Sequence, residues 1–302
     1  MSSLPEGFAE RAAQPEEAQL VADLMNAYDG AFGTGEQVAE DDVRSSWRDL
    51  GDRGRATLVL EDETPVAYYE LWPATPERVH LDGYVHPRSR GRGLGTWLVR
   101  NGEELARGLG EYAVSGTLAA DRAANELFER EGWRLVRAFF RMVIELEGTP
   151  APAPPQGLVV RTFRPGDAER FHAAQEEAFA DHWDHDPEPF DEFRRKQLES
   201  PESDQTLWWL VLDGEEVAAI VRCVRRRFEM GWISMLGVRR PWRRRGLGEL
   251  LLRTVFAEFA RRGETRVGLG VDAESETGAT RLYERVGMHV AFQANVFRKD
   301  LR

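Results

Sequence analysis

The chain has 302 residues, of which 42% are hydrophobic and 30% are charged, and its formal net charge is −12. This length suits two domains of about 150 residues each, and the composition is that of a soluble globular protein rather than a disordered or membrane-spanning one. The negative net charge argues against general affinity for nucleic acid, because phosphate groups would be repelled.

Two features of the sequence, its first residues and its cysteine content, indicate the cellular compartment. The first residues, MSSLPEGFAERAAQPEE, become acidic where a secretory signal would be basic and then apolar. Cys223 is the single cysteine, so no disulfide can form within the chain. We therefore expect a cytoplasmic protein with neither a membrane nor a nucleic acid as partner.

The first half begins with an amphipathic helical pattern at residues 18–32, followed by strand-like runs at 55–62 and 65–72. A further strand at 80–86 enters a glycine-rich turn, and a helix rich in Leu and Val leaves it. Another strand, a short helix and a last strand complete the half.

The second half repeats this order. Its helical pattern lies at 167–179 and its strand-like runs at 206–213, 216–224 and 232–238, before a second glycine turn. Helices mixed with strands at this spacing predict an α+β domain with a mixed, mostly antiparallel sheet flanked by helices.

Direct matches between the halves indicate a duplicated domain. LVLED at 58–62 corresponds to LVLDG at 210–214, and LFEREG at 127–132 corresponds to LYERVG at 282–287. The proline-rich segment GTPAPAPPQG, 148–157, favours an extended connector. We expect an N-terminal domain at 1–147 and a C-terminal domain at 158–302, and two such similar domains could pack as a pseudo-dimer.

The two glycine turns, SRGRGLG at 89–95 and PWRRRGLG at 241–248, each lie between a strand and a helix. A helix that starts directly after a strand leaves backbone N–H groups unpaired at its positive end, which favours a phosphate or pyrophosphate. Gly246 and Gly248 would let the backbone approach such a ligand, and Arg243 to Arg245 would add charged donors. One such turn alone could equally be a solvated helix start.

These turns resemble the acetyl-CoA pyrophosphate loop of the GNAT superfamily of N-acetyltransferases, and 271–288 is similar to that superfamily's second motif. The tandem arrangement resembles the mycothiol synthase-like acetyltransferases. The resemblance implies acetyl-CoA as co-substrate. It implies acetyl-CoA contacts from Val85, Arg90, Gly91, Arg92, Gly93 and Gly95 in the first half, and from Leu236, Val238, Arg243, Arg244, Arg245, Gly246, Leu247 and Gly248 in the second. No metal is expected, because consecutive loop positions such as those near 181–186 seldom point at one centre.

The resemblance also implies a catalytic tyrosine. In the superfamily a tyrosine on the second-motif helix serves the departing thiolate, and Tyr283 occupies that position. Phe128 stands at the equivalent place in the first half, so we expect chemistry only in the C-terminal domain. The alternative is that Tyr283 is a packed helix residue.

The general base is not assigned. Trp232 stands where mycothiol synthase has a catalytic glutamate, and Ser275 and Glu276 stand where the family often has asparagine. Glu229 and Ser234 are candidates for base or acceptor contact. A further candidate is 178–190, whose acidic residues and histidines could form an acceptor-pocket wall, a solvated loop or, less readily, a metal site.

The remaining chemistry-bearing residues have simpler interpretations. Cys223 lies in a strand and is expected to be a buried structural thiol. The tryptophans at 183, 208, 209, 232 and 242 could line an acceptor pocket, although most are expected in the core. The sequence therefore predicts an acetyl-CoA-dependent N-acetyltransferase acting on a small-molecule amine, with a CoA-responsive binding module or mycothiol synthesis as alternatives.

Overall fold

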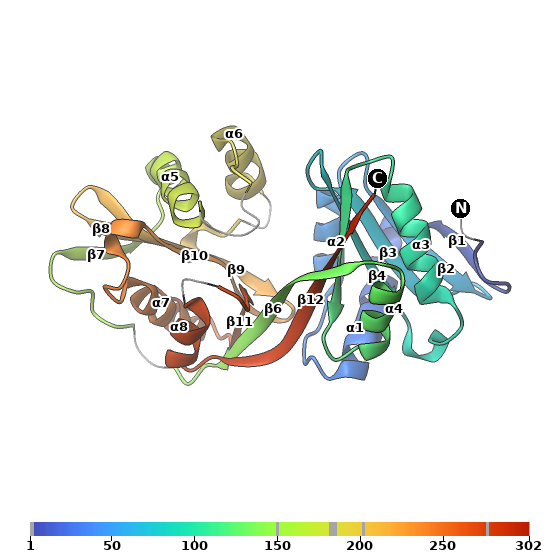
Figure 1. Ribbon diagram of the computed structural model, residues 1–302. Helices are drawn as coiled ribbons and strands as arrows, with labels where there is room; N and C mark the ends of the chain where they lie inside the picture. The colour runs from blue at the N-terminus through green and yellow to red at the C-terminus, as the bar shows by residue number, and fades with distance from the viewer. Residues whose placement is uncertain (1–2, 149–150, 181–185, 201–202, 276–277, 302) are drawn as a thin grey trace. The chain divides into compact units, whose positions relative to one another are not determined.

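The computed structural model describes residues 3–148, 151–180, 186–200, 203–275 and 278–301 (Figure 1). The chain forms two compact units. Unit 1 contains Met1–Arg141, Asp272–Glu274 and Val290–Arg302, and unit 2 contains Met142–Val271 and Ser275–His289. The boundaries of these units differ from the expected division of the chain at the proline-rich segment 148–157, because the last strand of the chain belongs to unit 1.

Unit 1 contains a sheet with the strand order β1-β2-β3-β4-β5-β12-β6. The pairing of β4 with β5 is parallel, whereas β2, β3 and β4 pair antiparallel with one another, as do β5 and β12. Its elements are β1 (Ala9–Ala12), α1 (Ala18–Phe32), α2 (Glu40–Asp49), β2 (Arg55–Glu61), β3 (Thr64–Pro73), β4 (Arg78–Val85), α3 (Leu94–Ala106), β5 (Tyr112–Leu118), α4 (Arg122–Arg130), the larger part of β6 (Arg134–Glu145) and β12 (His289–Asp300).

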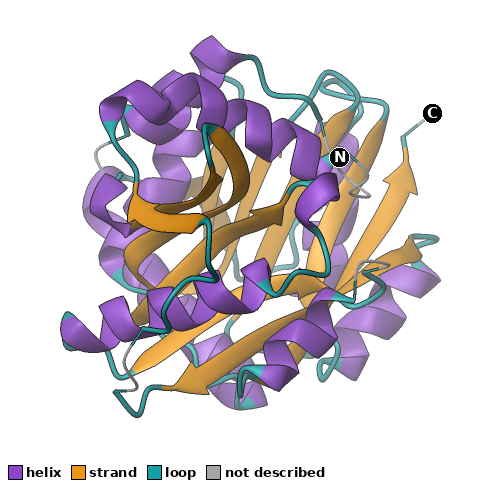
Figure 2. Cartoon of the chain, turned by 90° about the vertical axis from the view of Figure 1, so that its left-hand side faces the viewer, coloured by secondary structure: helices purple, strands orange, loops and turns teal. Residues whose placement is uncertain are grey.

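Unit 2 repeats this arrangement with the strand order β11-β10-β9-β8-β7, in which β10 and β11 are parallel. Helices lie against the strands, as Figure 2 shows. Its elements are β7 (Leu158–Thr162), α5 (Ala168–Phe179), α6 (Phe190–Phe193), β8 (Trp208–Asp213), β9 (Glu216–Arg227), β10 (Met230–Val238), α7 (Leu247–Arg261), β11 (Arg266–Asp272) and α8 (Ala279–Arg285).

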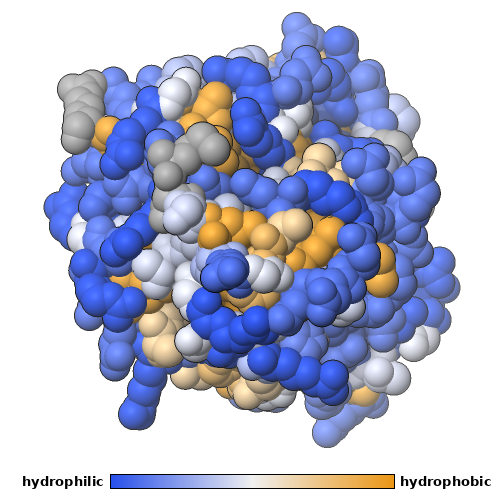
Figure 3. Space-filling view, turned by 90° about the vertical axis from the view of Figure 1, so that its right-hand side faces the viewer, coloured by the Kyte–Doolittle hydropathy of each residue, from blue (hydrophilic) through white to orange (hydrophobic). Residues whose placement is uncertain are grey.

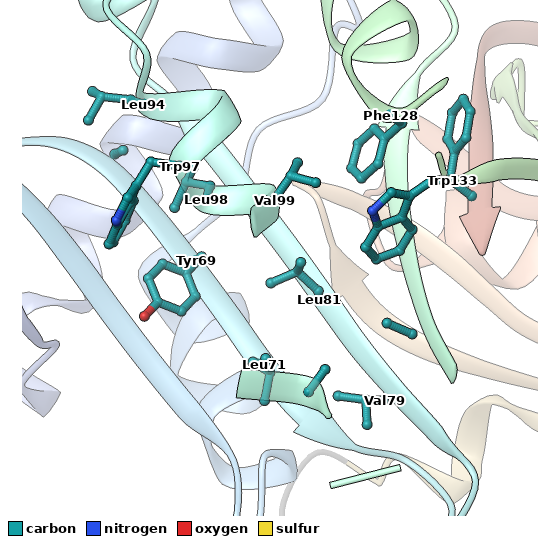
Figure 4. Packing of buried hydrophobic residues seen from close by; sticks show 14 of the residues in the cluster. Tyr69, Leu71, Val79, Leu81, Leu94, Trp97, Leu98, Val99, Phe128 and Trp133 are labelled. Carbon is teal, nitrogen blue, oxygen red and sulfur yellow. The ribbon is translucent and has the colours of Figure 1, made fainter. Parts of the chain in front are cut away.

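The core of unit 1 lies between the sheet and α3 (Figure 4). Tyr69 and Leu71 on β3 and Leu81 on β4 pack there with Trp97 of α3 and Phe128 of α4. Because side chains alternate along a strand, the residues between these core positions point to the opposite face of the sheet. That second face is covered by α1, which contacts both β3 and β4.

In unit 2 the corresponding face is filled by aromatic side chains. Phe171 of α5 and Phe193 of α6 pack on Trp208 of β8, together with Ile220 of β9 and Met235 of β10. The same fold therefore carries an apolar cluster between α5 and the sheet in unit 2.

The predicted α+β class with a mostly antiparallel sheet is confirmed. The helical pattern at 18–32 coincides with α1. Helix α2 is an addition that the sequence interpretation missed, because its single buried residue, Val43, gives almost no apolar periodicity. The surface shown in Figure 3 is mostly hydrophilic, with small apolar areas. Within the described residues, no helix combines the length and the apolar character needed to cross a membrane.

Candidate functional site

Each unit contains a pair of parallel strands that meet only near their beginnings. Strand β10 pairs with β11 at Gly231 and Trp232 but continues to Val238. Strand β4 pairs with β5 over residues 78–80 and continues to Val85. Among the described pairings, the later residues of β4 and β10 bond only to β3 and β9, so their other edge is open.

The open edge presents backbone donors. Arg239 N donates to Ala218 O at 3.1 Å, which makes Val238 and Ala219 a non-hydrogen-bonded pair of the β9–β10 ladder. The N–H groups of Val238 and Leu236 therefore point away from β9, toward the side of β11. In unit 1, His86 N donates to Val66 O at 2.9 Å, which gives Val85 the same orientation.

A β-bulge distinguishes β10 from β4. The register of β10 against β9 shifts between Ile233 and Met235, so Ser234 is the extra residue, and it is exposed. The register of β4 against β3 has no such shift along its described length. Bulges often lie next to active sites, where they redirect a backbone group. Of the two strands, only β10 of unit 2 has this bulge, at Ser234.

A helix begins immediately after each open strand. Gly93 and Gly246 are the N-caps of α3 and α7 and have φ values of 87° and 77°, a region that favours glycine. No side chain caps either helix. The first backbone bond of α7 is Leu250 N to Gly246 O at 3.0 Å, so the N–H groups of Leu247 and Gly248 lack helical acceptors. Such a helix start favours an anion.

The second glycine of each turn has a packing role. A Cβ atom on Gly248 would lie 2.8 Å from Leu282 Cδ2, and one on Gly95 would lie 3.3 Å from Leu127 Cδ2. These glycines let α8 approach α7 and α4 approach α3. We expected glycine at position 248 because a ligand would approach the backbone there. In the structure, the side chain that comes close to Gly248 is Leu282 of α8.

The first arginine of each turn bonds within its own unit. Arg90 donates to both carboxylate oxygens of Asp121. Arg243 donates to the carbonyl oxygens of Val238 at 3.1 Å and Ala178 at 3.2 Å. These guanidinium groups fix the turn to the end of β10 and to α5 in unit 2, and to the start of α4 in unit 1.

The following loop positions are more open to solvent. Arg92 pairs with Glu61 at 2.6 Å, and Arg245 lies 3.8 Å from Asp213. Arg244 is exposed and has a φ of 63°, where the first turn has Gly91 with a φ of 77°. A non-glycine residue in this conformation is strained. Arg244 and Arg245 are the arginines best placed to reach a ligand phosphate in solvent.

The aromatic residues of the second motif have different surroundings. Phe128 stacks on Phe297 at a centroid distance of 5.0 Å and contacts the edge of Trp133. Tyr283 lies on α8 with 8% of its surface exposed, and burial raises the pKa of its hydroxyl to about 12. Phe128 and Tyr283 are therefore buried to nearly the same degree, and they differ in that Tyr283 carries a hydroxyl, which is protonated at neutral pH.

The other predicted candidates are placed less favourably. Glu229 is exposed in the turn before β10, at the opposite end of that strand from the glycine turn, so the structure does not bring it to Tyr283. Cys223 is buried, which raises the pKa of its thiol. Trp208 and Trp232 are buried, and Trp209 and Trp242 are partly buried.

The histidine-rich segment cannot be placed in this site. Residues 181–185, with His182, Trp183 and His185, lie outside the described residues, as does Glu276. Within the described part of the chain, no group of three His, Cys, Asp or Glu residues is arranged to hold a metal ion.

The sequence matches the acetyltransferase (GNAT) family over residues 21–133 and again over residues 168–288. The chain belongs to the GNAT family of acetyltransferases. It is 33% identical over 240 residues to the mycothiol acetyltransferase of Thermomonospora curvata, covering 78% of this chain and 79% of the relative. It is 34% identical to the mycothiol acetyltransferase of Thermobispora bispora, covering 78% and 81%.

Solved structures give the same result. A GCN5-related N-acetyltransferase from Sphaerobacter thermophilus is 36% identical, with a TM-score of 0.82, and the alignment covers 99% of this chain and 98% of that one. A tandem GNAT protein from the clavulanic acid biosynthesis pathway shares the fold, with a TM-score of 0.76 at 16% identity over 98% of this chain and 99% of that one. This chain is thus an acetyltransferase with two GNAT regions, and acetyl-CoA is the co-substrate that the family uses.

Proposed function

We propose that the C-terminal GNAT region transfers the acetyl group of acetyl-CoA directly to the amine of a small molecule. The observation that carries this proposal is the joint presence, in unit 2, of an uncapped α7 start, the Ser234 bulge and the buried phenol of Tyr283. In unit 1 the phenol is replaced by Phe128, and β4 has no described bulge.

The uncapped start of α7 would hold the pyrophosphate of acetyl-CoA. The N–H groups of Leu247 and Gly248 supply donors there, and the helix dipole adds a positive end. The exposed side chains of Arg244 and Arg245 would add charge-assisted hydrogen bonds. Arg243 would act through the loop, because its guanidinium already bonds to two backbone carbonyls.

The reaction would proceed at the open edge of β10. The neutral amine nitrogen attacks the thioester carbonyl carbon, and the developing oxyanion accepts a hydrogen bond from the N–H of Leu236 or Val238. The C–S bond then breaks as Tyr283 donates its proton to the departing thiolate, and the proton that the new amide nitrogen loses passes through solvent and restores the phenol. The phenol is protonated at neutral pH, where burial raises its pKa to about 12. Holding the amine beside the thioester accelerates the reaction by proximity, so that no acyl-enzyme intermediate is needed.

The test uses isotopically labelled acetyl-CoA with a panel of amines and a metabolite extract, for the wild type and Tyr283→Phe. We expect a labelled N-acetyl product whose formation falls about 100-fold or more in the variant, with acetyl-CoA affinity unchanged. Equal turnover of the two proteins would remove Tyr283 from the mechanism. Binding of acetyl-CoA without any product would favour the alternative of a CoA-binding regulatory module.

A second candidate is mycothiol acetyltransferase activity, which the names of the relatives favour. Against it stands Trp232, a buried side chain that packs edge-on against Phe228 at a position where mycothiol synthase has its catalytic glutamate. Expression of the chain in cells that lack their own mycothiol acetyltransferase would decide. Restored mycothiol would identify the acceptor. If no mycothiol is formed, the acceptor is a different amine.

A further inference from the structure

Strand β9 places one charged side chain on the face of the unit 2 sheet that α5 covers. Arg222 lies directly opposite Trp208 on β8 and Met235 on β10. Residues that lie opposite each other share a face of the sheet, and Trp208 and Met235 both belong to the apolar cluster packed there. Burial lowers the pKa of Arg222 to about 10, although the charge of Glu188 acts to raise it, so the guanidinium is charged at neutral pH. A cation is therefore held among apolar side chains.

The contacts of Arg222 leave part of its hydrogen-bonding capacity unused. Its Nη1 donates to the amide oxygen of Gln197, and its guanidinium carbon lies 5.7 Å from the centre of the Trp208 ring. Arg222 Nε and Trp208 Nε1 are buried and bond to no described residue, and no described carboxylate forms an ion pair with Arg222. Buried donors are ordinarily paired with an acceptor. These two neighbouring donors therefore point to an acceptor that a ligand supplies.

The first repeat has the opposite charge at the same place. Counted back from the last pair of each ladder, Glu70 on β3 occupies the position of Arg222 on β9. Glu70 accepts hydrogen bonds from Ser46 Oγ at 2.7 Å and from the Tyr68 hydroxyl, so its two oxygens are bonded within the protein. The fold thus accommodates either charge here. Of the two residues, Arg222 is the one that keeps a buried polar atom without a described partner.

Arg222 lies close to the edge at which acetyl transfer is proposed. Residues directly opposite each other in an antiparallel ladder have Cα atoms about 4.5 to 5.5 Å apart. The residue opposite Arg222 is Met235, which precedes Leu236 on the open strand β10. The N–H of Leu236 points toward the side of β11 and is a candidate donor to the thioester oxygen. An acceptor that extends from this point over the face of β9 therefore meets the guanidinium of Arg222.

We propose that Arg222 binds a carboxylate of the acceptor, so that the acceptor is a small molecule with both an amine and a carboxylate. This inference rests on the proposed function, because a carboxylate bound here belongs to an acceptor only if unit 2 transfers acetyl groups. Arg222 is partly exposed, which gives a ligand access to it. Its Nε and Nη2 form one edge of the planar guanidinium and match the two oxygens of a carboxylate, while Nη1 stays bonded to Gln197. A purely cationic acceptor is repelled.

The test compares amino acids with their carboxamides as acceptors, because the amide keeps the size of the group and removes its charge. Acetyl transfer is measured for α-amino acids and straight-chain ω-amino acids, each beside its carboxamide. We expect kcat/KM to be about tenfold higher or more for the carboxylate of an accepted pair. Arg222→Gln should remove this preference by raising KM with kcat nearly unchanged, and Arg222→Lys should retain part of it. The control is Arg225→Gln, which removes an exposed charge from the same strand.

A binding measurement keeps the test independent of turnover. The indole N–H resonance of Trp208 is assigned by its absence from Trp208→Phe in two-dimensional NMR, and it reports on the guanidinium that lies beside the ring. With free CoA in place of acetyl-CoA, no acetyl group can be transferred. We expect the carboxylates to shift this resonance in the wild type and in Arg225→Gln, and not in Arg222→Gln.

The outcomes separate this inference from the proposed function. Equal acetylation of carboxylates and carboxamides would overturn the role of Arg222 and leave acetyl transfer in place. A Trp208 shift that depends on Arg222, without acetylation of any amine, would support the carboxylate site and reject the proposed function. If no carboxylate is a preferred acceptor and none shifts the Trp208 resonance, Arg222 does not bind a carboxylate, whatever the protein acetylates.

Discussion

Arg90 and Asp121 are joined by two hydrogen bonds, from Nη1 to Oδ2 at 2.8 Å and from Nη2 to Oδ1 at 2.5 Å, although 31 residues separate them in the sequence. Asp121 is 2% exposed and also caps α4 through the N–H of Ala124. This ion pair ties the glycine turn of unit 1 to the second-motif helix, so one contact positions both parts of the candidate cofactor site.

Arg90→Met should destabilise unit 1 by about 3 kcal/mol, because a buried carboxylate would lose its charged partner. Burial acts to raise the pKa of Asp121, but the bonds from Arg90 and Ala124 outweigh it and lower the pKa. The stabilisation is therefore present at neutral pH and is lost as the pH falls through the lowered folded pKa. Urea unfolding at pH 7 and pH 3 measures both effects. Arg92→Met, which breaks the more exposed pair with Glu61, is the control and should have a much smaller effect.

Gly248→Ala should destabilise unit 2 by about 1 kcal/mol or less, because its new methyl group would meet Leu282 Cδ2 at 2.8 Å, and this end of a flexible side chain can shift. Since Leu282 precedes Tyr283 on α8, displacement of α8 should also lower turnover more than acetyl-CoA affinity. Thermal unfolding and steady-state kinetics give the two readouts. The double variant Gly248→Ala with Leu282→Ala should recover part of the turnover, and a double variant as impaired as the single one would contradict the steric explanation.

Phe128→Tyr should lower the stability of unit 1 without creating activity in it. The ring is 7% exposed and packs between Phe297 and Trp133, so an added hydroxyl would be buried without a designed partner, at a cost of about 1 to 3 kcal/mol. The measurement is urea unfolding, together with acetyl transfer in a Tyr283→Phe background. Rescue of turnover in that double variant would show that unit 1 can use a phenol at this position.

Asp82→Asn should raise the stability of unit 1 at pH 8. Burial raises the pKa of Asp82 from 3.8 to about 6, so the folded state binds more protons than the unfolded state between these values. Stability therefore falls as the pH rises from about 4 to about 6 and stays lower above this range. Removing the charge should recover about 1 to 3 kcal/mol at pH 8 and little at pH 3. Thermal unfolding across this range tests the sign, with Asp23→Asn as the control.

The sequence by itself predicted a large part of this protein. Strong apolar periodicity indicated helix α1 and strands β2, β3, β8 and β9, because each pattern is local. The two glycine turns, with Gly93 and Gly246 at the helix starts, were predictable because glycine at a strand–helix junction has a specific backbone role. The matching halves indicated the duplication, and the family followed from these motifs.

Only the tertiary structure decided what the side chains do. No local pattern shows that Arg90 and Arg243 bond within the protein or that Gly248 admits Leu282, because those partners come from distant segments. The sequence shows that Glu70 lies two residues from Tyr68 and Asp82 two residues from Tyr84, so each pair shares a strand face. That Glu70 and Asp82 lie directly opposite each other depends on the β3–β4 register. The sequence determined the elements and motifs through local backbone preferences, whereas packing and strand register determined which charges meet.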